Sequence, residues 1–165
     1  MDRMNPSDAP RSASARPIAA TRGEYRYHQA ITTRWMDNDA YGHVNNVHFL
    51  SYFDTVVNTY LIGRGALDIQ ASPVIGLVVE TGCQYLAPLT YPETVTAGLR
   101  VAHVGRSSVR YEIALFAESA DTAAAQGYFV HVYVDRNSRR PVELPAALCA
   151  ALEPLRIPSH TPGVS

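Results

Sequence analysis

The spacing of apolar residues changes along the chain, and each spacing predicts a different element. Residues 25–34 alternate loosely between apolar and polar side chains, which predicts a first strand. From residue 46 onward, apolar side chains recur every three or four positions, which predicts a helix that ends at Gly63 and Gly65. The predicted stripe on this helix consists of Val47, Leu50, Phe53, Asp54, Val57, Tyr60 and Leu61. Because almost all of these side chains are apolar, we expect the helix to be largely buried.

Four strand-like segments and a short helix follow. The strands are predicted at residues 75–86, 93–103, 108–118 and 122–136, and the helix at residues 146–152. Short turns between the last three strands predict an antiparallel meander. One antiparallel sheet curled around one long apolar helix is the hot-dog fold, of class α+β. Such a sheet leaves a long open edge, so we expect a homodimer or homotetramer.

The ends of the chain differ in composition from its middle. Residues 1–23 combine Asp, Pro, Ser, Ala and Arg without an apolar run, which predicts a disordered tail and no secretory signal. Residues 24–155 are predicted to form a single domain, and residues 156–165 a loose tail. No run is apolar for long enough to span a bilayer, so we expect a cytoplasmic protein without a membrane partner.

Charge and cysteine content exclude several classes of function. The formal net charge of −1 argues against a nucleic-acid partner, which would require a basic excess. Cys83 and Cys149 do not form a C-x-x-C pair, and we expect both to be free thiols packed as small apolar groups. Cysteine and histidine do not follow a zinc-binding spacing, so no metal site is predicted.

The densest chemistry lies directly before the long helix. Residues 34–46, RWMDNDAYGHVNN, hold two carboxylates, an imidazole and several amides. The first N–H groups of a helix lack partners and could stabilise an oxyanion, while a carboxylate could attack a carbonyl or act as a general base. Gly42 would let the backbone approach a ligand closely. Helix capping accounts for such residues about as well on spacing alone, but the length of the motif favours a functional site.

This motif resembles a known signature. The pattern D-x-D-x-x-G-H-V-N-N at residues 37–46, followed by VHFLSYFD, resembles the 4-hydroxybenzoyl-CoA thioesterase-like family of hot-dog acyl-CoA thioesterases. The resemblance extends over about residues 25–155, with supporting segments at 84–93, 104–108 and 140–145. It implies hydrolysis of an acyl-CoA thioester to the free acid and coenzyme A. Coenzyme A is then part of the substrate, and no cofactor is expected.

The resemblance also implies roles for individual residues. The second aspartate of D-x-D, Asp39, corresponds to the catalytic carboxylate, which acts as nucleophile or general base. The backbone N–H at the start of the helix, at about Asn46, would hold the thioester carbonyl. His43 resembles a histidine proposed to participate in related plant acyl-carrier-protein thioesterases. Those enzymes have an asparagine where Tyr41 stands here, which weakens a triad that includes His43. Tyr41, Gly42 and Asn45 are expected to contact substrate.

A second group of polar residues follows Gly105. Arg106, Ser107 and Ser108 form a predicted turn that could bind a phosphate, and the family uses this loop for the phosphates of coenzyme A. A plain solvated turn is the alternative. Arg100 and Arg110 could contribute, depending on which face of the sheet they occupy.

Other titratable residues have simpler explanations. Asp37 is expected to cap the turn or pair with Arg34. Asp54 is either a structural acid, which we favour, or a second carboxylate of the site with a raised pKa. His48 is expected on the helix surface or at an interface. His103 and His131 are predicted to be hydrogen-bonded histidines within strands.

Three other functions compete with acyl-CoA hydrolysis. Acyl-carrier-protein thioesters are a closely related substrate class. A hot-dog hydratase would also use aspartate and histidine, but its signature differs. A non-catalytic acyl-CoA-binding module is the third alternative, although a carboxylate beside the thioester contributes little to binding an anionic ligand. The sequence leaves the acyl group undetermined.

Overall fold

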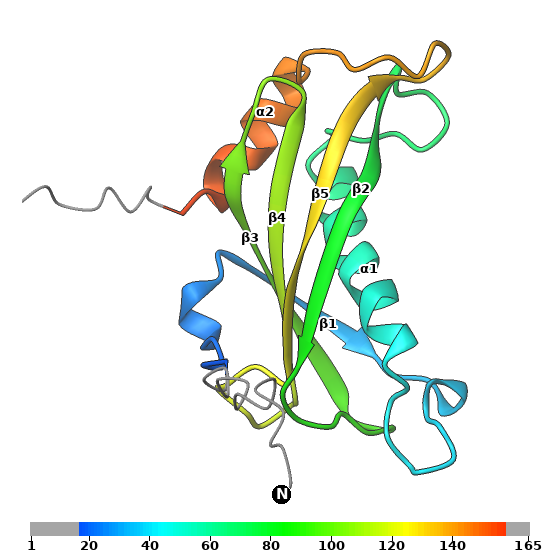
Figure 1. Cartoon of the computed structure of the whole chain (residues 1–165), viewed down its shortest axis with the longest axis vertical. Helices are drawn as coiled ribbons and strands as arrows, with labels where there is room; N and C mark the ends of the chain where they lie inside the picture. The colour runs from blue at the N-terminus through cyan, green and yellow to red at the C-terminus, as the bar shows by residue number, and fades with distance from the viewer. Residues whose placement is uncertain (1–16, 158–165) are drawn as a thin grey trace, which may run out of the picture.

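One five-stranded antiparallel sheet organises the part of the chain that the computed structural model describes, residues 17–157 (Figure 1). The strands lie in the order β1-β3-β4-β5-β2. Their bounds are Tyr27–Thr32 for β1, Val74–Tyr85 for β2, Thr94–Val104 for β3, Ser108–Phe116 for β4 and Ala125–Asp135 for β5. The predicted meander of the last three strands is confirmed. The sequence did not predict that β2 would lie at the far edge, paired with β5.

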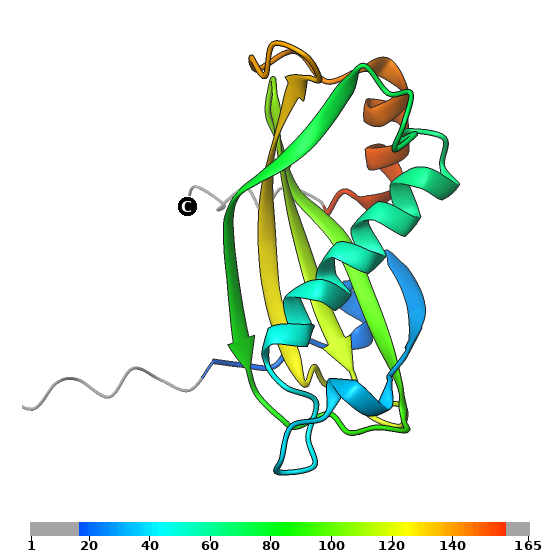
Figure 2. The same cartoon turned by 90° about the vertical axis from the view of Figure 1, so that its right-hand side faces the viewer.

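A single long helix crosses one face of this sheet (Figure 2). This helix, α1, spans Val47–Gly63, and the shorter α2 spans Ala146–Leu152, as predicted. Single 3-10 turns occupy Arg22–Glu24 (η1), Trp35–Asp37 (η2) and Glu153–Leu155 (η3). An antiparallel sheet that curls around one helix defines the α+β hot-dog fold, so the fold class expected from the sequence is confirmed.

The buried face of α1 supplies much of the core. Its buried side chains are Phe49, Tyr52, Phe53, Val56, Val57, Tyr60 and Leu61. They pack with the side chains that β4 points toward the helix, among them Tyr111 and Ile113, both fully buried. The predicted stripe was partly wrong, because Val47 is 66% exposed and Asp54 is exposed. A helix that is apolar on most of its circumference has no clear polar face, so its spacing does not fix which side is buried.

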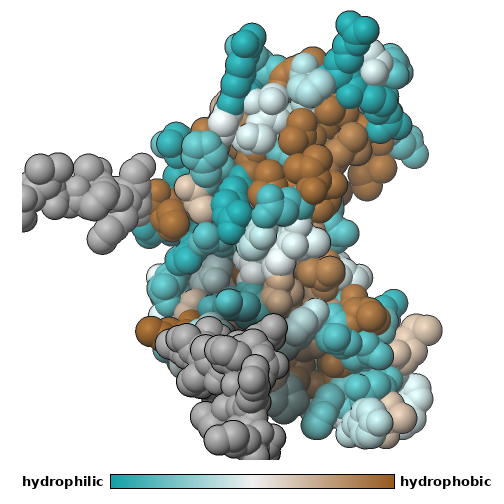
Figure 3. All heavy atoms as spheres, in the orientation of Figure 1, coloured by the Kyte–Doolittle hydropathy of each residue, from teal (hydrophilic) through white to brown (hydrophobic). Residues whose placement is uncertain are grey.

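The strand β2 forms an open, apolar edge of the sheet. Leu77, Val78 and Val79 are 37%, 46% and 60% exposed, and a β-bulge interrupts pairing with β5 between Val78 and Glu80. Figure 3 shows hydrophobic atoms gathered in the upper right of the molecule, where Figure 1 places the upper halves of β5 and β2. Such an edge presents unpaired backbone groups and apolar side chains together, which is typical of a strand that pairs with another chain.

The segment before β1 packs on the face of the sheet opposite α1. Tyr25 joins Ala114, Phe116 and Ala123 in a second, small apolar cluster. The guanidinium group of Arg22 donates hydrogen bonds to carbonyl oxygens in the turn between β4 and β5. Contacts with the sheet therefore begin before Glu24, although the predicted domain boundaries themselves stay predictions.

Within residues 17–157, no helix combines the length and the apolar character needed to cross a membrane.

Candidate active site

Asp37 holds together the loop that precedes α1. Its carboxylate is fully buried and accepts hydrogen bonds from the backbone N–H of Arg34 (2.9 Å), from Arg34 Nε (2.9 Å) and from the hydroxyl of Tyr52 (2.7 Å). Burial alone would raise the pKa of Asp37, but these donors and the charge of Arg34 together hold it below its ordinary value. The predicted pairing with Arg34 is confirmed, and the hydrogen bond from Tyr52 ties the loop to α1.

Asp39 sits in the turn that follows, with part of its carboxylate unused. Its Oδ1 accepts the backbone N–H of Tyr41 at 2.8 Å and that of His43 at 3.4 Å. Its own backbone N–H donates to the carbonyl of His43 at 2.8 Å, which closes the turn. Among residues 17–157, none donates a hydrogen bond to Oδ2. This oxygen is therefore available to a substrate or to water.

The turn depends on Gly42 because of the backbone conformation at this position. Gly42 has φ of +83°, a region that side chains with a Cβ rarely adopt, and its N–H donates to the carbonyl of Asp39. A Cβ at this position would meet nothing within 4 Å. We expected Gly42 to allow close approach of the backbone to a ligand, but the reason for glycine that the structure provides is the positive φ.

The start of α1 presents a backbone N–H that no group within residues 17–157 accepts. Asn45 Oδ1 accepts the backbone N–H of Val47 at 3.2 Å, so the side chain of Asn45 satisfies the first N–H of the helix. Asn46 occupies the N-cap position, and the described part of the chain offers no acceptor for its backbone N–H. An unpaired N–H at the positive end of a 17-residue helix is a suitable donor for a carbonyl or an oxyanion.

These groups share one cavity of about 480 Å³. Its lining includes Asp39, His43, Val44, Asn46, Phe49 and Tyr85, together with residues 86–88. The loop before α1, the first turn of α1 and the end of β2 thus meet at one place. The structure therefore brings the three residues predicted as catalytic to the same cavity, although no hydrogen bond joins the His43 side chain to Asp39 within the described residues.

Two aromatic residues that line this cavity were not among the site residues predicted from the sequence. Phe49 and Tyr85 meet edge to face, with ring centroids 5.2 Å apart, and the Tyr85 hydroxyl donates to the carbonyl of Asn46 at 3.4 Å. Tyr85 belongs to the segment 84–93 that supported the family resemblance, which was the one available signal. Periodicity could not place it, since the end of β2 and the start of α1 are far apart in sequence.

The other predicted site residues lie elsewhere. Tyr41 is 87% exposed and does not line the cavity. The turn of Arg106–Ser108 joins β3 to β4 at the end of the sheet opposite the Asp39 loop (Figure 1). Arg106 forms an ion pair with Glu143 at 3.1 Å, and the carbonyl of Ser107 accepts the N–H of Tyr133. A single chain therefore does not bring the predicted phosphate loop to Asp39.

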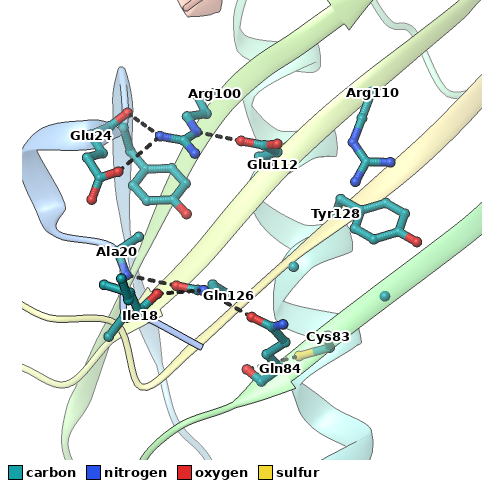
Figure 4. A pocket seen from close by; sticks show the side chains of 14 residues that line it. Ile18, Ala20, Glu24, Cys83, Gln84, Arg100, Arg110, Glu112, Gln126 and Tyr128 are labelled. Carbon is teal, nitrogen blue, oxygen red and sulfur yellow. Dashed lines mark hydrogen bonds and ion pairs between the residues drawn. The ribbon is translucent and has the colours of Figure 1, made fainter. Parts of the chain in front are cut away.

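Arg100 and Arg110 occupy the face of the sheet away from α1. They line a hollow of about 680 Å³, shown in Figure 4. Arg100 pairs with Glu112 at 2.7 Å and with Glu24 at 3.6 Å, and Arg110 lies 3.6 Å from the centroid of the Tyr128 ring. Both arginines thus have partners on the outer face, and neither reaches the Asp39 cavity.

The remaining candidates are placed on the surface or beside Asp37. Asp54 is exposed on α1, although partial burial of its carboxyl group raises its pKa. His48 Nδ1 lies 3.9 Å from Asp37 Oδ1.

Cys83 and Cys149 are free thiols, as predicted, but Cys149 is exposed and not packed. Among residues 17–157, histidine, cysteine and acidic side chains do not gather into a group of three or more that could hold a metal ion.

The protein thus has a hot-dog fold, and the carboxylate of Asp39 lies beside the first turn of its central helix. These two features can be compared with those of known protein families. A family model described as the thioesterase-like superfamily matches residues 33–152. The match covers most of the chain, and the protein belongs to this superfamily.

One curated relative carries a thioesterase name. The chain is 27% identical over 139 residues to the L-carnitine dehydrogenase/betainyl-CoA thioesterase of Agrobacterium fabrum. The match covers 83% of this chain but 28% of that relative, so this chain spans less than a third of the length of the protein it resembles.

Solved structures share the fold over most of their length. The PA5185 protein of Pseudomonas aeruginosa is 55% identical with a TM-score of 0.82, covering 85% of this chain and 97% of that one. A thioesterase from Thermus thermophilus, solved with coenzyme A and Zn, is 30% identical with a TM-score of 0.66, covering 79% and 95%. The PA2801 protein of Pseudomonas aeruginosa is 26% identical with a TM-score of 0.72, covering 77% and 98%.

Proposed function

We propose that this protein is a thioesterase that hydrolyses an acyl-CoA thioester to the free acid and coenzyme A. The observation that carries the proposal is the convergence of two groups in one cavity. Asp39 and Asn46 both line this cavity, and among residues 17–157 neither the Oδ2 of Asp39 nor the backbone N–H of Asn46 has a hydrogen-bond partner. That pair provides the two functions which thioester hydrolysis requires, a nucleophile or base and a donor for the oxyanion.

The chemistry can follow either of two routes at Asp39. In the first, a carboxylate oxygen attacks the carbonyl carbon, the C–S bond breaks, the thiolate leaves and takes a proton, and water then hydrolyses the resulting anhydride. In the second, Asp39 takes a proton from a water molecule as that water attacks the carbonyl. In both routes the N–H of Asn46 stabilises the oxyanion. Neither route uses a metal or a redox cofactor.

Coenzyme A is the proposed carrier of the acyl group. The Thermus thermophilus relative was solved with coenzyme A, and the Agrobacterium fabrum relative is named for a CoA thioester. Carrier-protein thioesters are the alternative substrate, and acyl-CoA binding without catalysis is the alternative function. The cytoplasmic location expected from the sequence stays a prediction.

A homodimer formed along β2 would explain the separation of the two predicted groups. If two copies pair antiparallel along this edge, the Arg106 end of one copy comes next to the Asp39 end of the other. The exposed apolar side chains of β2 support such pairing, as does its position at the edge of the sheet. Arg106 would then reach the phosphates of a thioester bound at the partner's Asp39 cavity.

We therefore expect Val79→Lys to dissociate the oligomer. Val79 is 60% exposed at the β-bulge, so the new ammonium group would be tolerated within one chain but would oppose strand pairing. Sedimentation velocity should give at least twice the mass of one chain for the wild type and a smaller species for the variant. Ile18→Lys, at a 90% exposed position before η1, is the matched control. A wild type that sediments as a monomer would contradict the prediction.

Thiol release from a panel of acyl-CoA esters tests the proposed reaction. The panel combines short, medium and long aliphatic chains with aryl esters, and the free thiol is measured against enzyme-free controls. We expect hydrolysis of at least one class, whose identity then gives the acyl preference. If no ester is hydrolysed, acyl-carrier-protein thioesters come next, and failure of both together with retained acyl-CoA binding would identify a binding module.

A further inference from the structure

A second cavity lies at the other end of α1, away from Asp39. Its volume is about 320 Å³, and it is bounded by the second half of α1, the start of β2, β5 and α2. Apolar side chains form most of its wall, among them Leu61, Leu67, Val74 and Leu148. Its size is ample for a small organic molecule, since an engineered apolar cavity of about 150 Å³ in another protein binds benzene.

One polar side chain in this wall has no hydrogen-bond partner within residues 17–157. His131, on β5, is 4% exposed, and its Nε2 is buried without a hydrogen-bond partner among the described residues. The ring stacks on Phe129 and meets Tyr111 edge to face, which fixes its plane. Burial lowers the pKa of His131 to about 4, so the imidazole is neutral near pH 7. The prediction that His131 would be hydrogen-bonded within its strand was therefore wrong.

The neighbouring strand leaves room beside this imidazole. Gly76 of β2 lines the same cavity, and a Cβ there would lie 3.0 Å from His131 Nδ1 and 3.1 Å from Cε1 of the Tyr133 ring. A larger residue at position 76 would close the space next to the ring. Glycine therefore leaves uncovered the side of the ring that carries Nδ1, and the described residues offer no hydrogen-bond partner for this nitrogen either.

Three other polar side chains of the wall already have hydrogen-bond partners. The amide nitrogen of Asn58 donates to a backbone carbonyl of α1, and the Tyr133 hydroxyl is 2.6 Å from that of Tyr111. Arg136 donates to two backbone carbonyls of residues 69–72. A bound water would need two to four polar partners. A wall with a single unsatisfied imidazole suits a mostly apolar ligand with one polar group better than it suits water.

We propose that this cavity is a binding site for an apolar ring or chain carrying one neutral hydroxyl or carbonyl group, with His131 as the hydrogen-bond partner of that group. A neutral imidazole both donates and accepts, so it can pair with either kind of group. An imidazole nitrogen left unpaired inside a protein costs free energy, and a ligand that pairs with Nδ1, the nitrogen beside Gly76, recovers that cost for this atom.

The ligand could be the acyl group of a substrate or a separate small molecule. Within one chain the cavity and Asp39 lie toward opposite ends of α1, about 20 Å apart at 1.5 Å per residue. Antiparallel pairing along β2, however, would place the cavity of one copy near the Asp39 loop of its partner. The idea that the cavity holds the acyl group of a substrate rests on the proposed thioesterase function. The proposal that the cavity is a binding site does not depend on that function.

Binding of two matched probes to the full-length protein tests the site without any turnover. The probes p-cresol and p-xylene have nearly the same shape, and differ by a hydroxyl in place of a methyl group. We expect calorimetry to show that both bind and that p-cresol binds more tightly. Long-range ¹H–¹⁵N spectra should show that p-cresol shifts the ring nitrogens of His131. If neither probe binds, or if p-cresol leaves these nitrogens unchanged, the proposal is overturned.

Two variants separate hydrogen bonding from folding. His131→Phe keeps an aromatic ring but removes both nitrogens, and should weaken p-cresol binding about five- to tenfold while leaving p-xylene binding unchanged. Because it removes an unsatisfied polar atom, this variant should melt no lower than the wild type. Gly76→Ala should weaken both probes by filling the space beside the ring. His103→Phe, in β3 and outside the cavity, is the control. Equal loss of both probes in His131→Phe would contradict the assigned hydrogen bond.

A kinetic comparison identifies the source of the ligand. The substrates are 8-hydroxyoctanoyl-CoA and nonanoyl-CoA, which have similar length but differ in the terminal group. A lower KM for the hydroxylated ester in the wild type, lost in His131→Phe, assigns the cavity to the acyl group. Equal KM values together with selective p-cresol binding assign it to a separate ligand. If neither ester reacts, the result contradicts the proposed thioesterase reaction but not the binding site, because probe binding is measured independently.

Discussion

Asp39→Asn is expected to lower kcat for thioester hydrolysis by at least about a hundredfold while leaving the fold intact. An amide is neither an effective nucleophile nor a base at neutral pH, and positioned proton transfer alone contributes about 10²–10⁴ in rate. The replacement preserves the turn, because the Oδ1 of asparagine can still accept the N–H groups of Tyr41 and His43. The group that changes is Oδ2, which has no donor in the described part of the chain.

Steady-state kinetics on the best ester of the panel, together with a melting curve, check this prediction. Substrate binding should survive in Asp39→Asn, and Tm should change by no more than about 2 °C, as for a surface substitution. Asp54→Asn is the matched control, since Asp54 is an exposed carboxylate on α1 outside the cavity. Retention of kcat within about threefold in Asp39→Asn, against an active wild type, would exclude Asp39 as the reacting group.

Local patterns in the sequence predicted the elements well. The spacing of apolar residues located α1 and α2, and the turn residues separated β3, β4 and β5. The motif at residues 37–46 identified the loop in which Asp39 lies, because its turn and helix start are built from neighbouring residues. In each of these cases the determining interactions lie within a few positions of one another.

Features that depend on distant segments were not predictable in the same way. The position of β2 beside β5 is a choice among possible strand orders, and the local pattern carries no information about it. The face occupied by Arg100 and Arg110 depends on strand phase, and a bulge between Val101 and His103 interrupts the alternation of β3. His131 resembles any histidine in a strand, and its lack of a partner follows from the residues that surround it after folding.

The two aspartates of the site have different environments, and their spacing in the sequence could not show which one is available to a substrate. Asp37 and Asp39 are two positions apart, yet Asp37 is fully buried with its hydrogen bonds satisfied, while Asp39 lines a cavity and its Oδ2 has no donor among residues 17–157. The family resemblance distinguished them, and their contacts give the physical reason. A carboxylate whose lone pairs are occupied by Arg34 and Tyr52 cannot act on a substrate.

Asp37→Ala is accordingly expected to destabilise the fold by about 3 kcal/mol or more. The change leaves the buried hydroxyl of Tyr52 and the backbone N–H of Arg34 without acceptors, and it breaks an ion pair whose acidic partner is fully buried. For a chain of this length, Tm should fall by about 6–12 °C. Tyr52→Phe should cost less and should recover part of the loss when combined with Asp37→Ala, since the hydroxyl is then absent.

The pH dependence of stability separates a buried carboxylate from a simple packing defect. In the folded protein, the pKa of Asp37 is held below its ordinary value of 3.8. The ionised carboxylate therefore stabilises the fold fully at pH values above the pKa that Asp37 has in the unfolded chain. This contribution is lost as pH falls through the lower, folded-state value. The difference in free energy of unfolding between wild type and Asp37→Asn should therefore be constant from about pH 5 to 8 and shrink below about pH 4. A difference that stays constant into that acidic range would show that Asp37 acts through its shape and not through its charge.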